Sequence, residues 1–237
     1  MRWDAYLILK IAGILTFVFA GTLYSHKKQG IPLTKCLIIT VLASAAAFAA
    51  SRLWFITQYA LGSEPYTPKD LLEAWNDAGS VLYGWIIGGT AMIVLLTDLY
   101  KINTVRFLDR VVPWMLIAQM FNRFGCFIGQ CCWGKPTDFF LRVWNSHEKA
   151  MVHPVQLYEA ALDGLLFYFV LRRQKRAGEA SFLYYTGYAA GRFFLEFLRG
   201  DNHAVFLGLT VPQLTSVFVL IAVPLLWKTP EVKKQLS

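Results

Sequence analysis

Three short polar clusters interrupt an otherwise apolar sequence. The first is N-R-F-G-C-F-I-G-Q-C-C-W-G-K at 122–135, the second is H-P-V-Q-L-Y-E at 153–159, and the third lies at 192–202. An ionisable side chain at membrane depth costs at least ~2.5 kcal/mol and by default marks a functional site. We therefore predict that the three clusters come together as one polar cavity in an integral membrane protein.

Arg123 is the first candidate for a functional charge. A long basic side chain near a helix end also snorkels to the membrane interface, so a purely structural role is the alternative. Gly125 and Gly134 follow it, and glycine allows the backbone to approach another helix or a ligand headgroup closely. Because the guanidinium fork suits phosphate, Arg123 with Arg192 or Arg199 would bind a phospholipid headgroup.

The third cluster places Arg192, Glu196 and Arg199 at i, i+4 and i+7, on one face of a helix. Glu196 is expected to pair with one of the arginines, and such pairing alone would explain the pattern as a stabilised helix end. Two arginines against one glutamate still leave a positive charge that would attract an anionic ligand. Both interpretations remain open on these residues alone.

The second cluster begins with His153 and Pro154 ahead of an apolar segment, a pattern also explained by a helix start. Gln156, Tyr158 and Glu159 then enter the segment as candidate binding residues. A single histidine is usually structural. The neighbouring polar clusters nevertheless make His153 a candidate catalytic residue.

Three of the four cysteines belong to the first cluster, as C-x4-C-C at Cys126, Cys131 and Cys132. This spacing lacks the paired C-x2-C units of structural zinc sites, so we predict no metal. Thiol chemistry and small apolar packing are the two remaining explanations. No Walker A loop or dinucleotide fingerprint is present, and we predict no cofactor.

The composition indicates a membrane protein with an all-α fold. The 237 residues are 56% hydrophobic and 16% charged, with a mean hydropathy of +0.44, which is too apolar for an ordinary soluble domain. Only helices or closed barrels satisfy their backbone in lipid, and the long apolar segments lack the strict alternation of a barrel. The net charge of +8 forms no basic stripe with interleaved aromatics, so nucleic acid is not an expected partner.

We predict a single transmembrane domain over residues 1–237 with seven spanning helices. Extracytoplasmic loops are expected at about 57–80 and 131–153. The predicted helices are Tyr6–Tyr24, Leu33–Ile56, Val81–Leu99, Val111–Gly129, Pro154–Leu171, Phe182–Leu198 and Val205–Trp227.

The distribution of basic residues predicts the orientation. Lysines and arginines are frequent at 27–35, 101–110, 172–176 and 228–234, which should therefore be cytoplasmic. The N-terminus is then outside and the C-terminus is in the cytoplasm. Arg52, Arg123, Arg192 and Arg199 all fall near the outward ends of their segments, so the site should face the extracytoplasmic leaflet of the plasma (inner) membrane.

Taken together, the three clusters resemble the bacterial prolipoprotein diacylglyceryl transferase family. The family signature G-R-x-G-N-F-x-N-G-E-x-x-G is similar to the stretch around Arg123, with Gly125, Phe127 and Gly134 retained. Its H-P-S-Q-L-Y-E matches residues 153–159 except at Val155, and its R-x-x-x-E-F-x-R matches residues 192–199. Order, spacing and expected topology agree across nearly the whole chain.

The resemblance implies transfer of a diacylglyceryl group from phosphatidylglycerol to the lipobox cysteine of a preprolipoprotein. A thioether forms and glycerol phosphate is released. By resemblance, Arg123 and Arg192 would bind the phosphate, with Arg199 and Glu196 supporting them. Arg52, in A-S-R-L-W-F, is similar to an arginine of the family at the outer end of the second helix.

The sequence departs from the family at several positions. Tyr83 stands where the family has a functional histidine, so Tyr83 or His153 would assume that role. Cys126 and Gly129 replace asparagines, and Cys131 replaces a glutamate. These changes indicate a divergent member. A related transferase with another acceptor, or a non-catalytic phospholipid-binding protein, would retain the same arginines.

Overall fold

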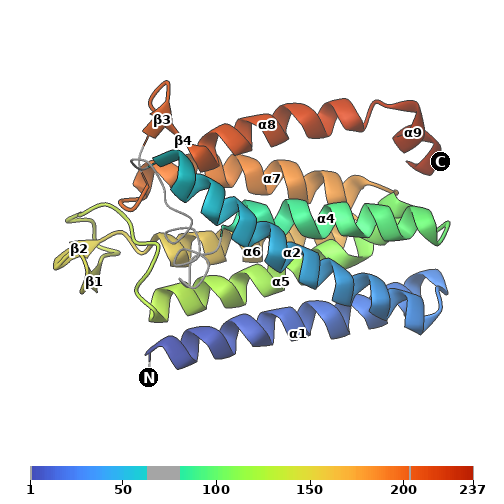
Figure 1. Ribbon diagram of the computed structural model, residues 1–237, viewed down its shortest axis with the longest axis horizontal. Coiled ribbons are helices and arrows are strands. Elements are labelled where there is room, and N and C mark those ends of the chain that lie inside the picture. The colour runs from blue at the N-terminus through green and yellow to red at the C-terminus, as the bar shows by residue number, and fades with distance from the viewer. Residues whose placement is uncertain (1, 63–80, 203, 237) are drawn as a thin grey trace. The chain divides into compact units, whose positions relative to one another are not determined.

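The computed structural model describes residues 2–62, 81–202 and 204–236, which are mostly helical (Figure 1). The chain divides into two compact units. One combines Met1–Gly30 with Val105–Ser237, and the other is Ile31–Thr104. Most of the loop expected at about 57–80 lies outside the described residues, and the single domain over 1–237 stays a prediction.

The first unit consists of helices and two short antiparallel hairpins. Its elements are α1 (Arg2–Gln29), α5 (Thr104–Ile128), β1 (Val143–Asn145), β2 (Ala150–Val152), α6 (Val155–Arg172), α7 (Glu179–Leu195), the 3-10 turn η1 (Glu196–Leu198), β3 (Ala204–Phe206), β4 (Leu209–Thr210), α8 (Val211–Leu226) and α9 (Pro230–Leu236).

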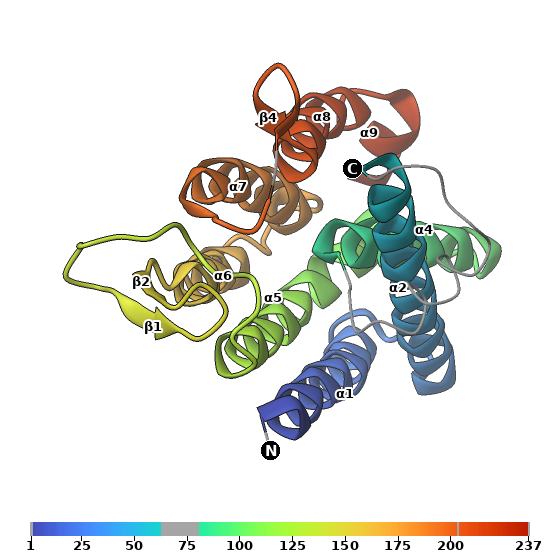
Figure 2. The ribbon, with the colours of Figure 1, turned by 60° about the vertical axis from the view of Figure 1, so that its left-hand side comes forward.

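Helix α7 packs against both α6 and α8 and lies between them in Figure 2. Two glycines of α7 make the contact with α6 close. A Cβ at Gly187 would lie 2.7 Å from a methyl group of Leu166, and one at Gly191 would meet Leu162 at a similar distance. Small residues of this kind let helices approach closely in a membrane protein, where there is no hydrophobic driving force between helices.

The start of α7 is fixed by a buried carboxylate of α5. Asp109 accepts hydrogen bonds from the backbone of Gly178 (2.6 Å) and from both the backbone (2.8 Å) and hydroxyl (2.6 Å) of Ser181. An acidic group at a helix N-terminus satisfies N–H groups that have no partner within the helix. Asp109 therefore links α5 to the helix that carries Arg192.

The second unit consists of α2 (Leu33–Gly62) and α4 (Leu82–Leu99) in its described part. The alanine-rich run at 45–51 of α2 allows close packing against α4. A Cβ at Gly84 would lie 2.5 Å from the Cα of Ser51, and one at Gly89 would lie 3.3 Å from the Cβ of Ala47. The hydroxyl of Ser51 also accepts a hydrogen bond of 3.0 Å from the backbone of Val81, just before α4.

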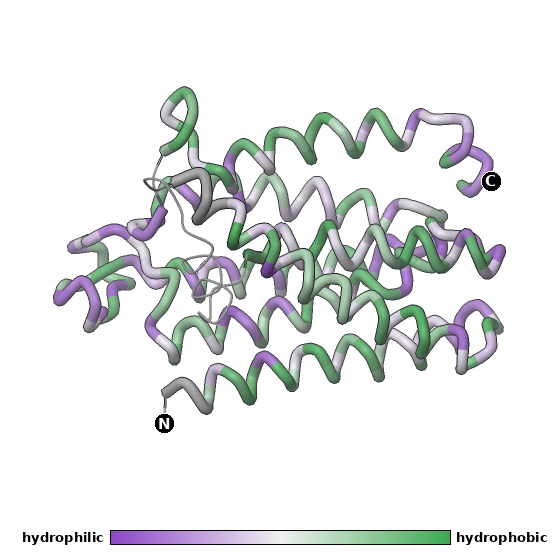
Figure 3. Tube along the Cα trace, viewed as in Figure 1, coloured by the Kyte–Doolittle hydropathy of each residue, from purple (hydrophilic) through white to green (hydrophobic). Residues whose placement is uncertain are grey.

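Length and composition confirm the helical membrane character. Hydrophobic residues follow the helices and hydrophilic ones gather in the loops (Figure 3). Among the described residues, four helices satisfy the criteria for membrane spans, and a fifth span is possible if α8 and α9, bent by 71°, count as one. These four are Ala5–Gln29, Leu33–Thr57, Leu82–Leu99 and Thr104–Ile128. Seven spans and the orientation stay predictions.

Two of the predicted helix starts are wrong. The fourth predicted segment begins at Thr104 rather than Val111, because Asp109 is not a loop residue but the buried link to α7. The last predicted segment begins at Val211 rather than Val205, because residues 204–210 form the hairpin β3–β4. Leu207 and Gly208 both have positive φ, 50° and 74°, which is typical of a hairpin turn and incompatible with a helix.

Candidate functional site

The three polar clusters converge on Glu159, a carboxylate of α6 with 1% of its surface exposed. Arg123 from the end of α5 contacts Glu159 Oε2 through Nε. Arg192 from the last turn of α7 lies 2.6 Å from Glu159 Oε1, and Arg199 after η1 lies 3.5 Å from the same oxygen. Side chains from three separate sequence motifs therefore form one buried ion-pair network, as expected from their polarity.

Glu196 and Asp201 complete the network. Glu196 Oε2 lies 2.8 Å from Arg192 and 3.8 Å from Arg199. Asp201 accepts two hydrogen bonds from Arg199, of 2.9 and 2.5 Å, in the bidentate geometry that arginine favours with carboxylates. Burial raises the pKa of Asp201, although the positive charge of Arg199 acts in the opposite direction.

Glu196 also fixes the start of α8. Its Oε1 accepts hydrogen bonds from Asn202 (2.6 Å) and from the hydroxyl of Thr210 (2.8 Å). Thr210 is the N-cap of α8 and forms a capping box with Gln213. Asn202 lies within the third cluster but was not a predicted site residue, and Thr210 lies outside all three clusters; nothing in their local sequence relates either of them to Glu196.

The formal charges of this network balance. Arg123, Arg192 and Arg199 face Glu159, Glu196 and Asp201, so the surplus positive charge expected on the third cluster is matched by acids from elsewhere. The donors are distributed unevenly, however. Among the described residues, Arg192 pairs with two carboxylates and Arg199 with three, whereas Arg123 pairs with Glu159, through Nε.

A crossing of three backbone segments positions Arg199 and His153. Gly134 donates to the carbonyl of His153 (3.1 Å) and forms an isolated bridge with Arg199, while Gly200 donates to the carbonyl of Trp133 (3.1 Å). A Cβ at Gly134 would lie 2.5 Å from the carbonyl oxygen of His153 and 2.7 Å from its Cβ. Gly134 therefore allows the loop before β1 to pass between His153, which begins the second motif, and Arg199, near the end of the third motif.

The second motif surrounds this crossing. The ring of His153 is half-buried and lies 3.4 Å, Nδ1 to hydroxyl, from Tyr158. Gln156 is buried and donates to the carbonyl of Cys131 (2.6 Å). Gly125 packs against α1, since a Cβ there would lie 3.1 Å from the ring of Tyr6. Direct ligand contacts of these residues stay predictions.

The three cysteines of the first motif come together beside the arginines. The Sγ atoms of Cys126, Cys131 and Cys132 all lie within 4.8 Å of one another. Hydrogen bonds from Cys126 and Cys131, with the positive charges of Arg199 and Arg123, lower the pKa of Cys132, although desolvation acts in the opposite direction. The C-x4-C-C spacing does not reveal this triad, because it depends on how the chain turns after α5.

Arg52 and Tyr83 belong to the second compact unit. Arg52 is half-buried on α2 with its guanidinium 5.5 Å from the ring centre of Phe48, and Tyr83 is buried near the start of α4. Their predicted roles at the site stay predictions.

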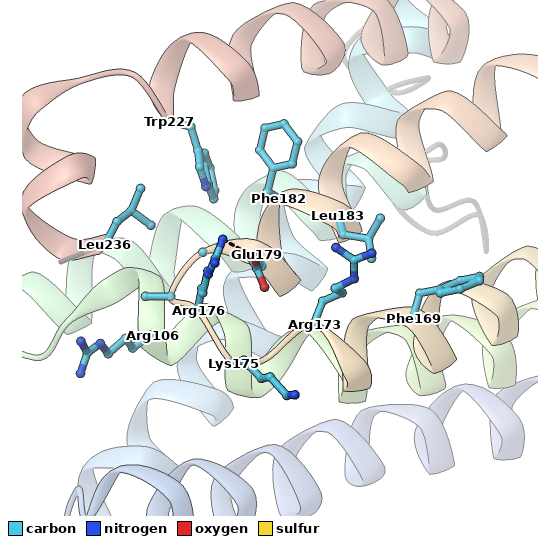
Figure 4. A pocket seen from close by; sticks show the side chains of 12 residues that line it. Arg106, Phe169, Arg173, Lys175, Arg176, Glu179, Phe182, Leu183, Trp227 and Leu236 are labelled. Carbon is cyan, nitrogen blue, oxygen red and sulfur yellow. Dashed lines mark ion pairs between the residues drawn. The ribbon is translucent and has the colours of Figure 1, made fainter.

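A basic cavity lies at the other end of the first unit (Figure 4). Its volume is about 980 Å³, and its lining combines the apolar side chains of Phe182 and Trp227 with four basic ones, Arg106, Arg173, Lys175 and Arg176. Arg106 and Arg123 lie 17 residues apart on α5, about 25 Å along a helix. The cavity is therefore separate from the arginine network, and its basic residues belong to segments that the sequence predicts to be cytoplasmic.

Comparison with known proteins places this site in a family. The sequence model of the family described as prolipoprotein diacylglyceryl transferase matches residues 1–228. A protein of Clostridium tetani named phosphatidylglycerol–prolipoprotein diacylglyceryl transferase is 36% identical over 162 residues, which cover 65% of this chain and 64% of the relative. Proteins of the same name from Clostridium perfringens (number 2) and Staphylococcus aureus are each 29% identical, covering 94% and 93% of this chain and 88% and 82% of the relatives.

The match of the family model extends over nearly the whole chain and includes all three motifs that meet at Glu159. The chain belongs to the prolipoprotein diacylglyceryl transferase family.

Proposed function

We propose that this protein transfers a diacylglyceryl group from phosphatidylglycerol to the cysteine thiol of a prolipoprotein. The relatives named above carry this activity in their names. The observation that carries the proposal is the buried network in which Arg123, Arg192 and Arg199 share Glu159. Buried arginines at the ends of apolar helices fit a ligand that is both lipidic and phosphorylated.

Arg123 is the proposed phosphate-binding residue. Glu159 contacts its Nε and orients the guanidinium, and the N–H donors of the two Nη groups would bind phosphate oxygens. Such donors stabilise negative charge that develops on the leaving glycerol phosphate when the carbon–oxygen ester bond breaks. Arg192 is already bound to two glutamates and would add positive charge beside the phosphate.

The residues proposed to lie around this phosphate are Arg199, Glu196 and those of the second motif. Arg199 is tied to Asp201 and Glu196, so its role is to keep the network in place. His153, whose ring faces the Tyr158 hydroxyl, is proposed to accept the thiol proton of the acceptor, with Tyr83 as the alternative base. Unchanged activity in both Tyr83→Phe and His153→Ala would exclude this assignment.

A small pocket supports a peptide acceptor. It measures about 230 Å³ and lies between the end of α5 and the β1–β2 hairpin, with Gln156, Phe127 and Trp144 in its lining. Gln156 contacts the backbone of Cys131, so the pocket adjoins the thiol cluster. A small apolar side chain next to the acceptor cysteine would fit there.

The proposed setting is the plasma membrane, with seven spans, the N-terminus outside and the site facing the extracytoplasmic leaflet. Helices α6 and α7, of 18 and 17 residues, are just long enough to cross the hydrocarbon region. The basic residues at the opposite helix ends support this orientation.

The test is a transfer assay with purified protein, phosphatidylglycerol and a cysteine-containing lipobox peptide. Mass spectrometry of the peptide is expected to show the mass of one diacylglyceryl group. Arg123→Ala should lose this product. Arg106→Ala, the same change on the same helix but exposed and far from the network, should keep it.

The other outcomes separate the alternatives. Release of glycerol phosphate without a mass gain on the peptide would indicate a different acceptor. Phosphatidylglycerol bound without any release of glycerol phosphate would indicate a lipid-binding protein and contradict the transferase proposal.

A further inference from the structure

The thiol cluster of Cys126, Cys131 and Cys132 has the arrangement of a metal site. Each pair of Sγ atoms lies within 4.8 Å. Zinc binds thiolate at about 2.3 Å, and two ligands in a tetrahedral site are then about 3.8 Å apart. Closing the cluster around one ion requires each pair of sulfurs to move by at most about 1 Å, which is within the reach of cysteine rotamers.

The backbone after α5 is shaped to bring these sulfurs together. The N–H of Cys131 bonds to the carbonyl of Cys126 (3.2 Å), which folds the chain back onto the last turn of the helix. Gln130 and Cys132 both adopt positive φ, 55° and 61°. This conformation is unfavourable for residues other than glycine and persists only where the surrounding structure enforces it, which is common at functional sites.

Neighbouring side chains hold the turn in place. Gln156 donates to the carbonyl of Cys131, and Asn145 at the end of β1 donates to the carbonyl of Gln130 (3.2 Å). Both amides are buried. Such contacts to the residues around metal ligands fix ligand direction and are typical of metal sites.

We propose that Cys126, Cys131 and Cys132 bind one zinc ion, leaving its fourth position open to the thiol of the acceptor. Three thiolates select a thiophilic ion, and three protein ligands with one open position are typical of catalytic rather than structural zinc. Cys126 is buried, whereas Cys131 and Cys132 are half-buried, so the cluster is partly accessible.

The role of the open position rests on the proposed transferase function. A zinc ion there would hold the acceptor sulfur as a thiolate, and His153, the base proposed above, would accept its proton. The sulfur then forms a bond to the glycerol carbon while the bond from that carbon to the phosphate ester oxygen breaks, and glycerol phosphate leaves with the electron pair. A free thiol with a pKa of about 8.5 is only about 3% ionised at pH 7, so zinc raises the thiolate fraction by up to about thirtyfold.

The first experiment measures the metal itself. Protein purified in detergent without chelator is expected to contain about one zinc per chain, and Cys126→Ser, Cys131→Ser and Cys132→Ser should each lose it. Cys36→Ser is the matched control, because Cys36 lies on α2 outside the cluster and should keep full zinc content. Cobalt added to zinc-free protein should give the sulfur-to-cobalt charge-transfer band in the wild type and in Cys36→Ser only.

The outcomes separate the metal from the activity. The metal-site proposal is wrong if the wild type contains no more zinc than Cys131→Ser. It is also wrong if the purified protein has a disulfide between two of these cysteines. If zinc binds but the lipobox peptide leaves the cobalt spectrum unchanged, the open position does not take the acceptor. Zinc bound normally without any diacylglyceryl transfer refutes the proposed function while the metal site stands. Removal of zinc should slow transfer by up to about thirtyfold, with recovery on adding zinc back.

Discussion

Replacing Glu159 by glutamine tests the central feature of the site, the sharing of one buried carboxylate among three arginines. Glu159→Gln keeps the size of the side chain and removes its charge. Arg192 and Arg199 retain Glu196 and Asp201 as partners, but Arg123 loses the one ion pair that the described residues provide. The cost therefore concentrates on Arg123, which is 4% exposed.

Breaking a buried ion pair on one side costs about 3–5 kcal/mol, because the remaining charge is left uncompensated. For a chain of this size, that corresponds to a fall in apparent Tm of roughly 6–20 °C. Thermal unfolding in detergent measures the change. Glu179→Gln is the control, since Glu179 lies 3.9 Å from Arg176 in a pair whose arginine side chain is 86% exposed, and such pairs contribute about 0–1 kcal/mol.

The double variant Arg123→Gln with Glu159→Gln sharpens the test. Removing both charges leaves no uncompensated ion, so the double variant should be more stable than the sum of the two single changes predicts, by about 0.5–3 kcal/mol. A Glu159→Gln protein that unfolds at the same temperature as Glu179→Gln would refute the reasoning, as would strictly additive effects in the double variant.

Three further substitutions test how the site is positioned. Gly134→Ala should lower stability by about 1–3 kcal/mol and reduce transfer, because its Cβ would lie 2.5 Å from a backbone carbonyl oxygen. The control is Gly164→Ala, whose Cβ would have ordinary contacts at 3.5 Å. This control should be neutral in the same thermal and transfer assays. Asp109→Asn should cost about 1.5–3 kcal/mol in thermal unfolding by weakening charged hydrogen bonds at the start of α7, and wild-type stability would contradict this role. Thr210→Val removes the N-cap of α8 and a hydrogen bond to Glu196. We expect it to lower the free energy of unfolding by about 1 kcal/mol and to raise the KM for phosphatidylglycerol. An unchanged KM would show that this hydrogen bond does not affect substrate binding.

The sequence predicts the helices well, because their apolar runs are long and carry few charges. It also predicts that the three motifs meet, since a buried charge in an apolar segment requires a partner. It does not predict which acid serves which arginine. Glu159 was a candidate only through its motif, yet it contacts all three arginines, and Asp201 became a partner of Arg199 only through the turn after η1.

The features that the sequence does not predict depend on local backbone geometry. The thiol triad requires positive φ at Gln130 and Cys132, conformations that no residue type there announces. The hairpin β3–β4 contains Val205 and Phe206, whose apolar character equally fits the start of a helix. The charge of Asp109 suggests a loop residue. The structure instead places it inside α5, where its carboxylate is buried and accepts hydrogen bonds from Ser181.

The backbone crossing at Gly134 has a practical consequence for the β1–β2 hairpin. Hydrogen bonds between Thr137 and Met151 (2.9 Å) and between Lys135 and His153 (3.1 Å) close the base of this excursion. With both ends pinned, doubling the length of the loop costs only about 0.6 kcal/mol in closure entropy. The exposed turn at 146–149 therefore offers a place to insert an epitope, and antibody access to that epitope in intact cells would report directly which side of the membrane the hairpin faces.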